Sequence, residues 1–259
     1  MGRAMIYSNV VASSLAYHPL PPDEALKEAL SLGYEGLEVL CDPPWHPRGW
    51  PPALVRKLAE AGATLSLHAP IADVNLISPH PAARAFAEAE LARTLVLAAT
   101  LGAEAVTFHL GYRSTGSPYQ PPWEEAVAAI RRLAVRAKSL GVKLCLENDP
   151  KSPYTFLSDL ELFEKLLSEL GIPGTLDLGH AWTAHGEDTL ALLPRLVPHI
   201  HTLHLHDNHG QADEHLPLGA GVIQLARALA ILGNESRLFV VEHFSEADLV
   251  RSLDWLQSR

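Results

Sequence analysis

Short apolar runs alternate with amphipathic helical stretches along the whole chain, and this alternation limits the fold more than any other feature of the sequence. Strands are expected at residues 5–8, 36–40, 64–68, 105–109, 142–147, 174–178, 201–206 and 237–242. Helices are expected at residues 22–32, in a stretch that ends near 61, and at 81–101, 124–140, 158–170, 187–196, 222–232 and 246–257, the last with Ser245 as its N-cap. Eight strand–helix units in 259 residues predict an α/β protein, a single (β/α)8 TIM barrel that forms one domain over residues 1–259.

A doubly wound open sheet would show the same alternation, usually with fewer units. Its dinucleotide-binding members carry G-x-G-x-x-G after the first strand, where this chain reads SNVVASSLAYHP. The sequence therefore argues against dinucleotide binding at the position where that signal is strongest.

The charge balance bears on the choice of partners. With 20 Lys and Arg against 30 Asp and Glu, the net charge of −10 makes a nucleic-acid partner less expected than a small molecule, because non-specific nucleic-acid binders usually have a basic surplus. No run is apolar enough to span a bilayer, and MGRAMIYSNV lacks a cleavable apolar segment, so we expect a cytoplasmic protein without a membrane partner. Twenty Pro with two Met and two Cys indicate a thermostable protein, and the oligomeric state stays open.

Residues 201–221, HTLHLHDNHGQADEHLPLGAG, combine an expected strand with a polar loop rich in imidazole and carboxylate groups. Neutral imidazole and carboxylate are ligands of zinc, manganese and non-haem iron. A solvated loop with scattered histidines is the alternative interpretation of this stretch alone.

The ends of the other strands favour the metal site. In a barrel, side chains alternate between the interior and the helix layer, and this rule turns one ligand-type residue inward at the end of each of six consecutive strands. These residues are His68, His109, Glu147, Asp177, His204 and Glu242. A single buried histidine is usually a hydrogen-bonded core residue, but several buried acids without an inward Lys or Arg need a cation. The pattern predicts a metal site at the C-terminal mouth of the barrel, where catalytic residues of this fold lie.

Three further residues lie just beyond these strands. His180 follows Asp177 by three positions, and Asp213 and His215 lie in the loop after residues 201–206. They are expected either to hold a second or third ion or to orient the ligands of the first.

Residues 68–111, together with the motifs CLEN, TLDLGHAWTAHGE, HLHDNHGQADEHLPLGAG and VVEH, resemble the xylose-isomerase-like TIM barrel superfamily. That superfamily joins sugar phosphate isomerases and epimerases with AP endonuclease family 2, the endonuclease IV type of abasic-site nuclease. The resemblance covers roughly residues 30–245 and implies that Glu147, Asp177, His204 and Glu242 hold the metal common to the group. It also implies that His68, His109, His180, Asp213 and His215 match the extra ligands of the zinc cluster in the nucleases. The expected cofactor is a divalent metal, zinc or manganese, with roughly one to three ions.

The chain departs from the nuclease branch at two places. Nucleases carry a DNA-inserting tyrosine after the His of the third strand, where this chain has Ile71. They carry a Gly-rich turn after the Glu of the fifth strand, where this chain has NDPK at residues 148–151. The run HDNHGQADEHLPLGAG is more similar to the isomerase and epimerase branch.

The first hypothesis is a metal-dependent sugar or sugar-phosphate isomerase or epimerase that transfers a proton through an enediolate. Glu147 and Glu242 are expected to face each other across the substrate, one as base and the other as acid. Glu38 and His206, or His180 in place of His206, would bind hydroxyl groups, and Trp182 would wall the pocket. Pairing of Glu38 with a nearby Arg or Lys, and packing of Trp182 within a loop, are the structural alternatives.

The second hypothesis is a zinc phosphodiesterase that acts on abasic DNA in the manner of endonuclease IV, because all of the extra ligand positions are filled. The acidic charge and the two departures place it second. A metal-dependent sugar-binding barrel without catalysis is a third possibility that composition alone does not exclude.

Overall fold

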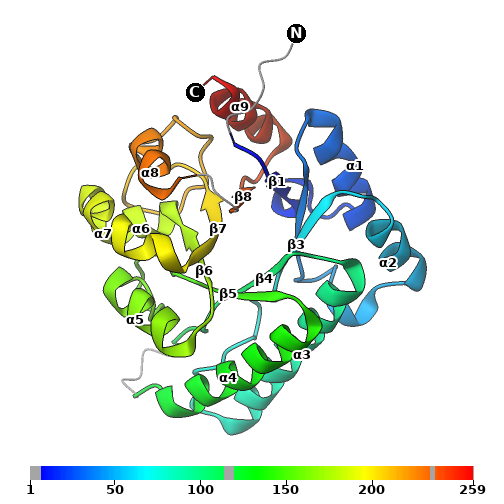
Figure 1. Cartoon of the computed structure of the whole chain (residues 1–259), viewed down its shortest axis with the longest axis vertical. Helices are drawn as coiled ribbons and strands as arrows, with labels where there is room; N and C mark the ends of the chain where they lie inside the picture. The colour runs from blue at the N-terminus through cyan, green and yellow to red at the C-terminus, as the bar shows by residue number, and fades with distance from the viewer. Residues whose placement is uncertain (1–6, 114–119, 234–236, 259) are drawn as a thin grey trace.

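The protein folds as a closed barrel of eight parallel strands in the order β1 to β8, as a computed structural model that describes residues 7–113, 120–233 and 237–258. The strands are β1 (Val10–Ser13), β2 (Gly36–Leu40), β3 (Thr64–His68), β4 (Ala105–Phe108), β5 (Lys143–Glu147), β6 (Gly174–Asp177), β7 (Ile200–Leu205) and β8 (Leu238–Val241). Figure 1 shows them at the centre with the helices arranged around them. The predicted (β/α)8 TIM barrel is confirmed.

Helices cover the outside of the barrel and bury one face against it. They are α1 (Pro22–Leu32), α2 (Pro52–Ala59), α3 (Pro81–Leu101), α4 (Trp123–Leu140), α5 (Leu160–Leu170), α6 (Leu178–His185), α7 (Thr189–Leu196), α8 (Leu225–Leu232) and α9 (Glu246–Gln257). In α3, for example, Leu91, Leu95 and Ala98 recur at helical spacing and are fully buried. The predicted N-cap is also confirmed, since the Ser245 hydroxyl accepts a hydrogen bond from the Asp248 amide at 3.3 Å. None of the described helices is both long and apolar enough to cross a bilayer.

The first strand was predicted at the wrong place. Residues 7 and 8 precede the barrel, and residues 5 and 6 lie outside the described part of the chain. The run Val10–Ser13 forms β1 instead, because it pairs with both β2 and β8 and its side chains are all buried. Most other predicted ends lie within about three residues of those observed.

One helix was not predicted at all. Residues Leu178–His185 form α6 directly after β6, with the Asp177 carboxylate accepting a hydrogen bond from the His180 amide at its start. The segment is short and contains Gly179, which lowers its helix propensity, so its pattern alone did not predict a helix. This helix turns His180 back over the mouth of the barrel.

The barrel interior is layered, with apolar side chains deeper in the barrel and polar side chains nearer its C-terminal mouth. Val11, Leu238 and Val240 form a small buried cluster inside the barrel. Thr107 and Thr175 are fully buried, and their hydroxyls lie 2.8 Å apart. The inward and outward alternation predicted for the strands therefore holds, and it leaves the last inward residue of each strand at the mouth.

Candidate metal centre

The predicted ligands gather at one cavity of about 340 Å³ at the mouth of the barrel. Seven of them line it, namely His68, His109, Glu147, His180, Asp213, His215 and Glu242. Asp177, His204 and His206 are fully buried beside these residues, with 0 % exposure. Side chains from β3 to the segment after β8 thus converge, although they are spread over most of the chain.

Glu147, the last residue of β5, lies at the centre of the first group of ligands. Its Oε2 lies 3.1 Å from His68 Nε2 and 3.2 Å from His109 Nε2. Its Oε1 lies 3.2 Å from His204 Nδ1 and 3.6 Å from His180 Nδ1. Each oxygen of this one carboxylate therefore faces a different pair of imidazoles.

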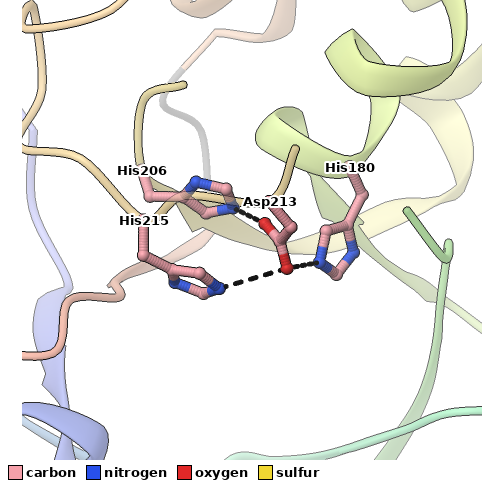
Figure 2. A group of neighbouring side chains, drawn as sticks. All are labelled: His180, His206, Asp213 and His215. Carbon is pink, nitrogen blue, oxygen red and sulfur yellow. Dashed lines mark hydrogen bonds and ion pairs between the residues drawn. The ribbon is translucent and has the colours of Figure 1, made fainter. Parts of the chain in front are cut away.

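Asp213, from the loop between β7 and α8, lies at the centre of a second group. Figure 2 shows its carboxylate among three imidazoles, with one oxygen towards His206 and the other towards His180 and His215. The three distances are 3.3 Å to His206 Nε2, 3.2 Å to His180 Nε2 and 3.3 Å to His215 Nε2. His206, predicted to bind substrate, lies in this group and does not line the cavity.

The four residues that the resemblance implies for the common metal are only partly grouped. Glu147 and Glu242 approach the same atom, His204 Nδ1, at 3.2 and 3.4 Å. The register of the sheet sets Asp177 beside His204, but the ligand atoms of Asp177 group with those of Glu147 and His180.

Glu38 lies below the site rather than at the cavity, with 0 % exposure. Its Oε1 is 3.0 Å from His204 Nε2, and its Oε2 accepts a hydrogen bond from the Ser66 hydroxyl at 2.9 Å. Its observed partners are thus a histidine and a serine, and no Arg or Lys among the described residues pairs with it. Glu38 Oε1 and His204 Nε2 are both buried without a hydrogen-bond partner among the described residues, so this is a close charge contact. His204 Nδ1 lies on the side of Glu147 and Glu242.

Trp182, expected to wall the pocket, lies in α6 with 4 % exposure and is not among the residues that line the cavity. Its indole packs near Gly210 and is part of the hydrophobic core. Trp182 is therefore a packed residue, as in the structural alternative, although it lies in a helix and not in a loop.

Backbone carbonyls fix which nitrogen of three histidines faces the site. His68 Nδ1 lies 2.9 Å from the Ala69 carbonyl, His180 Nδ1 lies 2.8 Å from that of Asn148, and His215 Nδ1 lies 3.2 Å from that of Glu242. Because a carbonyl only accepts, each Nδ1 carries the hydrogen and each neutral ring turns the Nε2 lone pair towards a carboxylate. That arrangement is repulsive unless a proton or a cation lies between, and it is the usual orientation of metal-bound histidine.

Buried polar atoms without hydrogen-bond partners also support a metal site here. Among the described residues, His204 Nδ1, His206 Nε2 and Asp177 Oδ2 are buried and make no hydrogen bond, although carboxylates lie within 3.4 Å of both nitrogens. Lone pairs directed at a shared point, rather than at each other, explain this geometry. Imidazole nitrogen and carboxylate oxygen fit zinc or manganese, so the residues present suit a divalent ion.

The buried carboxylates of the site also need positive charge close to them. Burial alone would raise the pKa of Glu147, but the neighbouring His204 and His109 hold it well below its usual range. Burial disfavours protonated His68, yet its hydrogen bond to Glu147 raises the pKa of this imidazole to about 9. The pKa of His215 is raised to about 9 by Asp213, again against the effect of burial. Without an ion, protons on the imidazoles supply the charge that the acids require.

Several residues that shape the site were not predicted. Asn148 accepts from the Asp177 amide at 2.8 Å and donates to the Asp177 carbonyl at 3.0 Å, which fixes that ligand. Asp149 Oδ1 lies 3.0 Å from His109 Nδ1. Asp207 accepts from the amides of Asn208, Gly219 and Ile223 at 2.9 to 3.1 Å. The only sequence signal was their place directly after a strand, because residue type does not distinguish an acid that binds backbone amides from one that binds metal.

We expect Glu38→Gln to weaken metal binding at His204 by about 10- to 100-fold, since the change removes the negative charge that lies 3.0 Å from His204 Nε2 and makes the imidazole a stronger ligand. Competition with a chromophoric chelator measures this affinity. Glu35→Gln is the matched control, because Glu35 directly precedes the same strand and its carboxylate is bonded to the Asn9 amide, away from the site. Equal affinities of the two variants would contradict the role of Glu38.

Two relatives in sequence differ in what their names say of activity. The uncharacterized protein MJ1614 of Methanocaldococcus jannaschii is 31% identical over 160 residues, a match that covers 61% of this chain and 61% of the relative. The probable endonuclease 4 of Mycobacterium ulcerans is 26% identical over 78% of this chain and 82% of its own length.

Two solved structures are similar over nearly the whole chain. A D-tagatose 3-epimerase-like protein superposes with a TM-score of 0.83 at 23% identity over 96% of both chains, which shows the fold alone. The TTHB071 protein of Thermus thermophilus, soaked with ZnCl2, superposes with a TM-score of 0.72 at 28% identity over 96% of this chain and 97% of the other.

The family described as the xylose isomerase-like TIM barrel matches residues 26–259, which include every candidate metal ligand named above. The barrel topology and the ligand-rich mouth agree with that match. The chain therefore belongs to the xylose isomerase-like TIM barrel family.

Proposed function

We propose that the protein is a divalent-metal-dependent isomerase or epimerase of a sugar or sugar phosphate. The observation that carries this proposal is the approach of two carboxylates to one imidazole at the edge of the cavity. Glu147 from β5 and Glu242 from just after β8 lie 3.2 and 3.4 Å from His204 Nδ1, and both line the cavity. Two acids held near one point can remove a proton from a carbon and return one.

The two carboxylates differ in how closely imidazoles surround them. Glu147 has imidazoles near both of its oxygens, whereas the Glu242 carboxylate meets His204 through one oxygen, Oε2. Although burial opposes ionisation, His204 lowers the pKa of Glu242 to about 2, so it is a carboxylate at neutral pH. Glu147 is ionised as well, so we assign proton removal to Glu242 because fewer imidazoles surround its carboxylate oxygens. A bound divalent ion would stabilise the negative charge that develops on the substrate oxygens.

The cavity suits a small polar molecule with an apolar face. Its volume of about 340 Å³ is within the range of small-molecule pockets, about 300 to 1,000 Å³. Leu15, Leu40, Val74 and Phe244 form part of its wall, together with the polar ligands. Such a wall excludes water from the reacting atoms and packs against the C–H groups of a sugar ring.

Deuterium exchange tests the proposal directly. We expect the protein, reconstituted with manganese, cobalt or zinc, to exchange a carbon-bound hydrogen of at least one ketose in a panel of free and phosphorylated sugars in D2O. Mass spectrometry and NMR locate the deuterium. Glu242→Gln should lose the exchange while keeping its fold by circular dichroism. Absence of exchange with every sugar and every metal in the panel would reject the proposal.

A second candidate function is a zinc phosphodiesterase that acts on abasic DNA. Two further groups of ligands favour it, His180 with His206, Asp213 and His215, and His68 with His109 and Glu147. The probable endonuclease 4 relative has the corresponding name, whereas the net charge of −10 weighs against a nucleic-acid partner. Cleavage of a duplex with a single abasic site by the zinc form, and of no intact duplex, would establish this activity.

Metal binding should release protons and strengthen as the pH rises. With pKa values raised to about 9, His68 and His215 are protonated at pH 7 in the metal-free protein, but a ligand imidazole must be neutral. Below about pH 9 these protons must leave, so the affinity rises with pH and levels off above that value. Isothermal titration with zinc in buffers of different ionisation enthalpy measures the protons released. An affinity that stays constant from neutral pH up to the raised pKa values would contradict this expectation.

A further inference from the structure

We propose that the group of His180, His206, Asp213 and His215 is a closed, four-ligand ion site with a structural role, which is to fasten the loop between β7 and α8 to the mouth of the barrel. The group of His68, His109 and Glu147 keeps an open position for the substrate. This inference rests on the proposed function only in that divalent ions bind at the mouth.

The number of ligand atoms distinguishes the two groups. One atom from each of the four residues lies within 4.8 Å of the others, and Figure 2 shows the four side chains directed towards one another. Four nitrogen and oxygen ligands complete the tetrahedral shell of a structural zinc, whereas three protein ligands leave one position free. His68, His109 and Glu147 supply only three. Both groups border the cavity, but only the second has a further, buried residue, His206, that does not line it.

His206 is the ligand that closes the site. It is fully buried and does not line the cavity. Its Nε2 lies 3.2 Å from Asp177 Oδ1 and 3.3 Å from Asp213 Oδ1, and it has no hydrogen-bond partner among the described residues. Its ring stacks on that of His215, with centroids 4.1 Å apart and planes 15° apart. A buried imidazole nitrogen that makes no hydrogen bond is costly unless something binds it.

The backbone of α6 leaves space for this ring. A Cβ on Gly179 would lie 1.9 Å from His206 Cε1 and 2.3 Å from its Nε2. Any side chain at residue 179 would therefore displace the ring from the group. Asn208 also donates to the Gly179 carbonyl at 3.0 Å, which keeps this part of α6 against the segment that carries His206.

The four ligands come from three parts of the chain, which is why an ion among them would act as a cross-link. His180 belongs to α6, His206 directly follows β7, and Asp213 and His215 lie in the loop. Asp207 already ties the far end of that loop through the Gly219 and Ile223 amides. The Asp213 carboxylate meets the barrel through its imidazole contacts, so the order of its segment should depend on the ion.

The test uses the whole protein loaded with zinc. We expect two classes of ion in a chelator chase, with the slow class released at least about tenfold more slowly than the fast one. In His206→Asn the slow class should disappear, and amide hydrogen exchange in residues 209–216 should rise about tenfold or more. The fast class should remain. His209→Asn is the control, because His209 lies in the same loop but is bonded to Glu214 at the surface. It should keep the slow class of ion.

Two further measurements keep the test decisive if His206→Asn folds poorly. Gly179→Ala should reproduce the loss of the slow class without removing a ligand. In the unmutated protein, cobalt in the slow class should show the intense visible absorption of four-coordinate cobalt. Six-coordinate spectra, or a slow class that persists in His206→Asn with unchanged exchange, would overturn the inference. A protein that binds no ion would overturn the proposed function as well, whereas ions held independently of His206 would overturn this inference alone.

Discussion

Glu147→Gln should abolish turnover, with a loss of at least about 10³-fold, whichever reaction the protein catalyses. The change removes one negative charge from between four imidazoles, those of His68, His109, His180 and His204. It weakens two groups of candidate ligands together, because Glu147 belongs to both. Activity measured beside metal content should show both losses in the same variant.

Glu104→Gln is the matched control for this experiment. Glu104 immediately precedes β4 at the opposite end of the barrel and pairs with Lys143 and His201, so it has the same chemistry far from the mouth. It should keep nearly all activity and its full metal content. If Glu147→Gln kept near-normal turnover with ions bound, Glu147 would have no essential role in the reaction.

Removal of the ions should lower the melting temperature strongly. A ligand that binds only the folded state at about 1,000 times its Kd stabilises it by about 4 kcal/mol. For a chain of this size that corresponds to a shift of about 8 to 16 °C for each ion. The physical reason is that Glu147, Asp177 and Glu242 are buried acids that must otherwise share the site with protonated imidazoles.

Calorimetry before and after dialysis against a chelator measures this shift, and added zinc should restore the original value. The control is dialysis against the same chelator already saturated with zinc, which should leave the melting temperature unchanged. If the stripped protein, verified to be metal-free, melted at the same temperature as the loaded one, the ions would contribute nothing to stability.

The parts of the fold that were predicted depend on local sequence alone. The apolar alternation in residues such as 64–68 turns Leu65 and Leu67 towards the helices and His68 towards the interior, and the structure follows it. Closure of the barrel then brings residues far apart in sequence to one mouth. Because the alternation of side chains along one strand is a short-range property, the ligand-bearing positions were accessible before any contact was known.

What was missed depends on contacts between segments. Glu38 is inward-facing like the candidate ligands, but its depth in the barrel places it beside His204 and not among the residues that line the cavity. His206 joins the second group because Gly179 of α6 leaves it space, and α6 itself was not expected. Asp207 is an acid beside a ligand loop, yet three backbone amides engage it. Sequence gives the chemical type of these residues, whereas their partners follow only from packing.

Because each oxygen of Glu147 faces a different pair of imidazoles, the groups at the mouth cannot fill independently. An ion beside His68 would fix the rotamer of Glu147 and neutralise part of its charge, which changes the carboxylate available to an ion beside His204. An ion beside His204 would have the same effect on the His68 side. Thermodynamic linkage then requires that occupancy of one position changes the affinity of the other by the same factor in both directions. Metal titrations of this protein should therefore be fitted with an interaction constant rather than with separate sites.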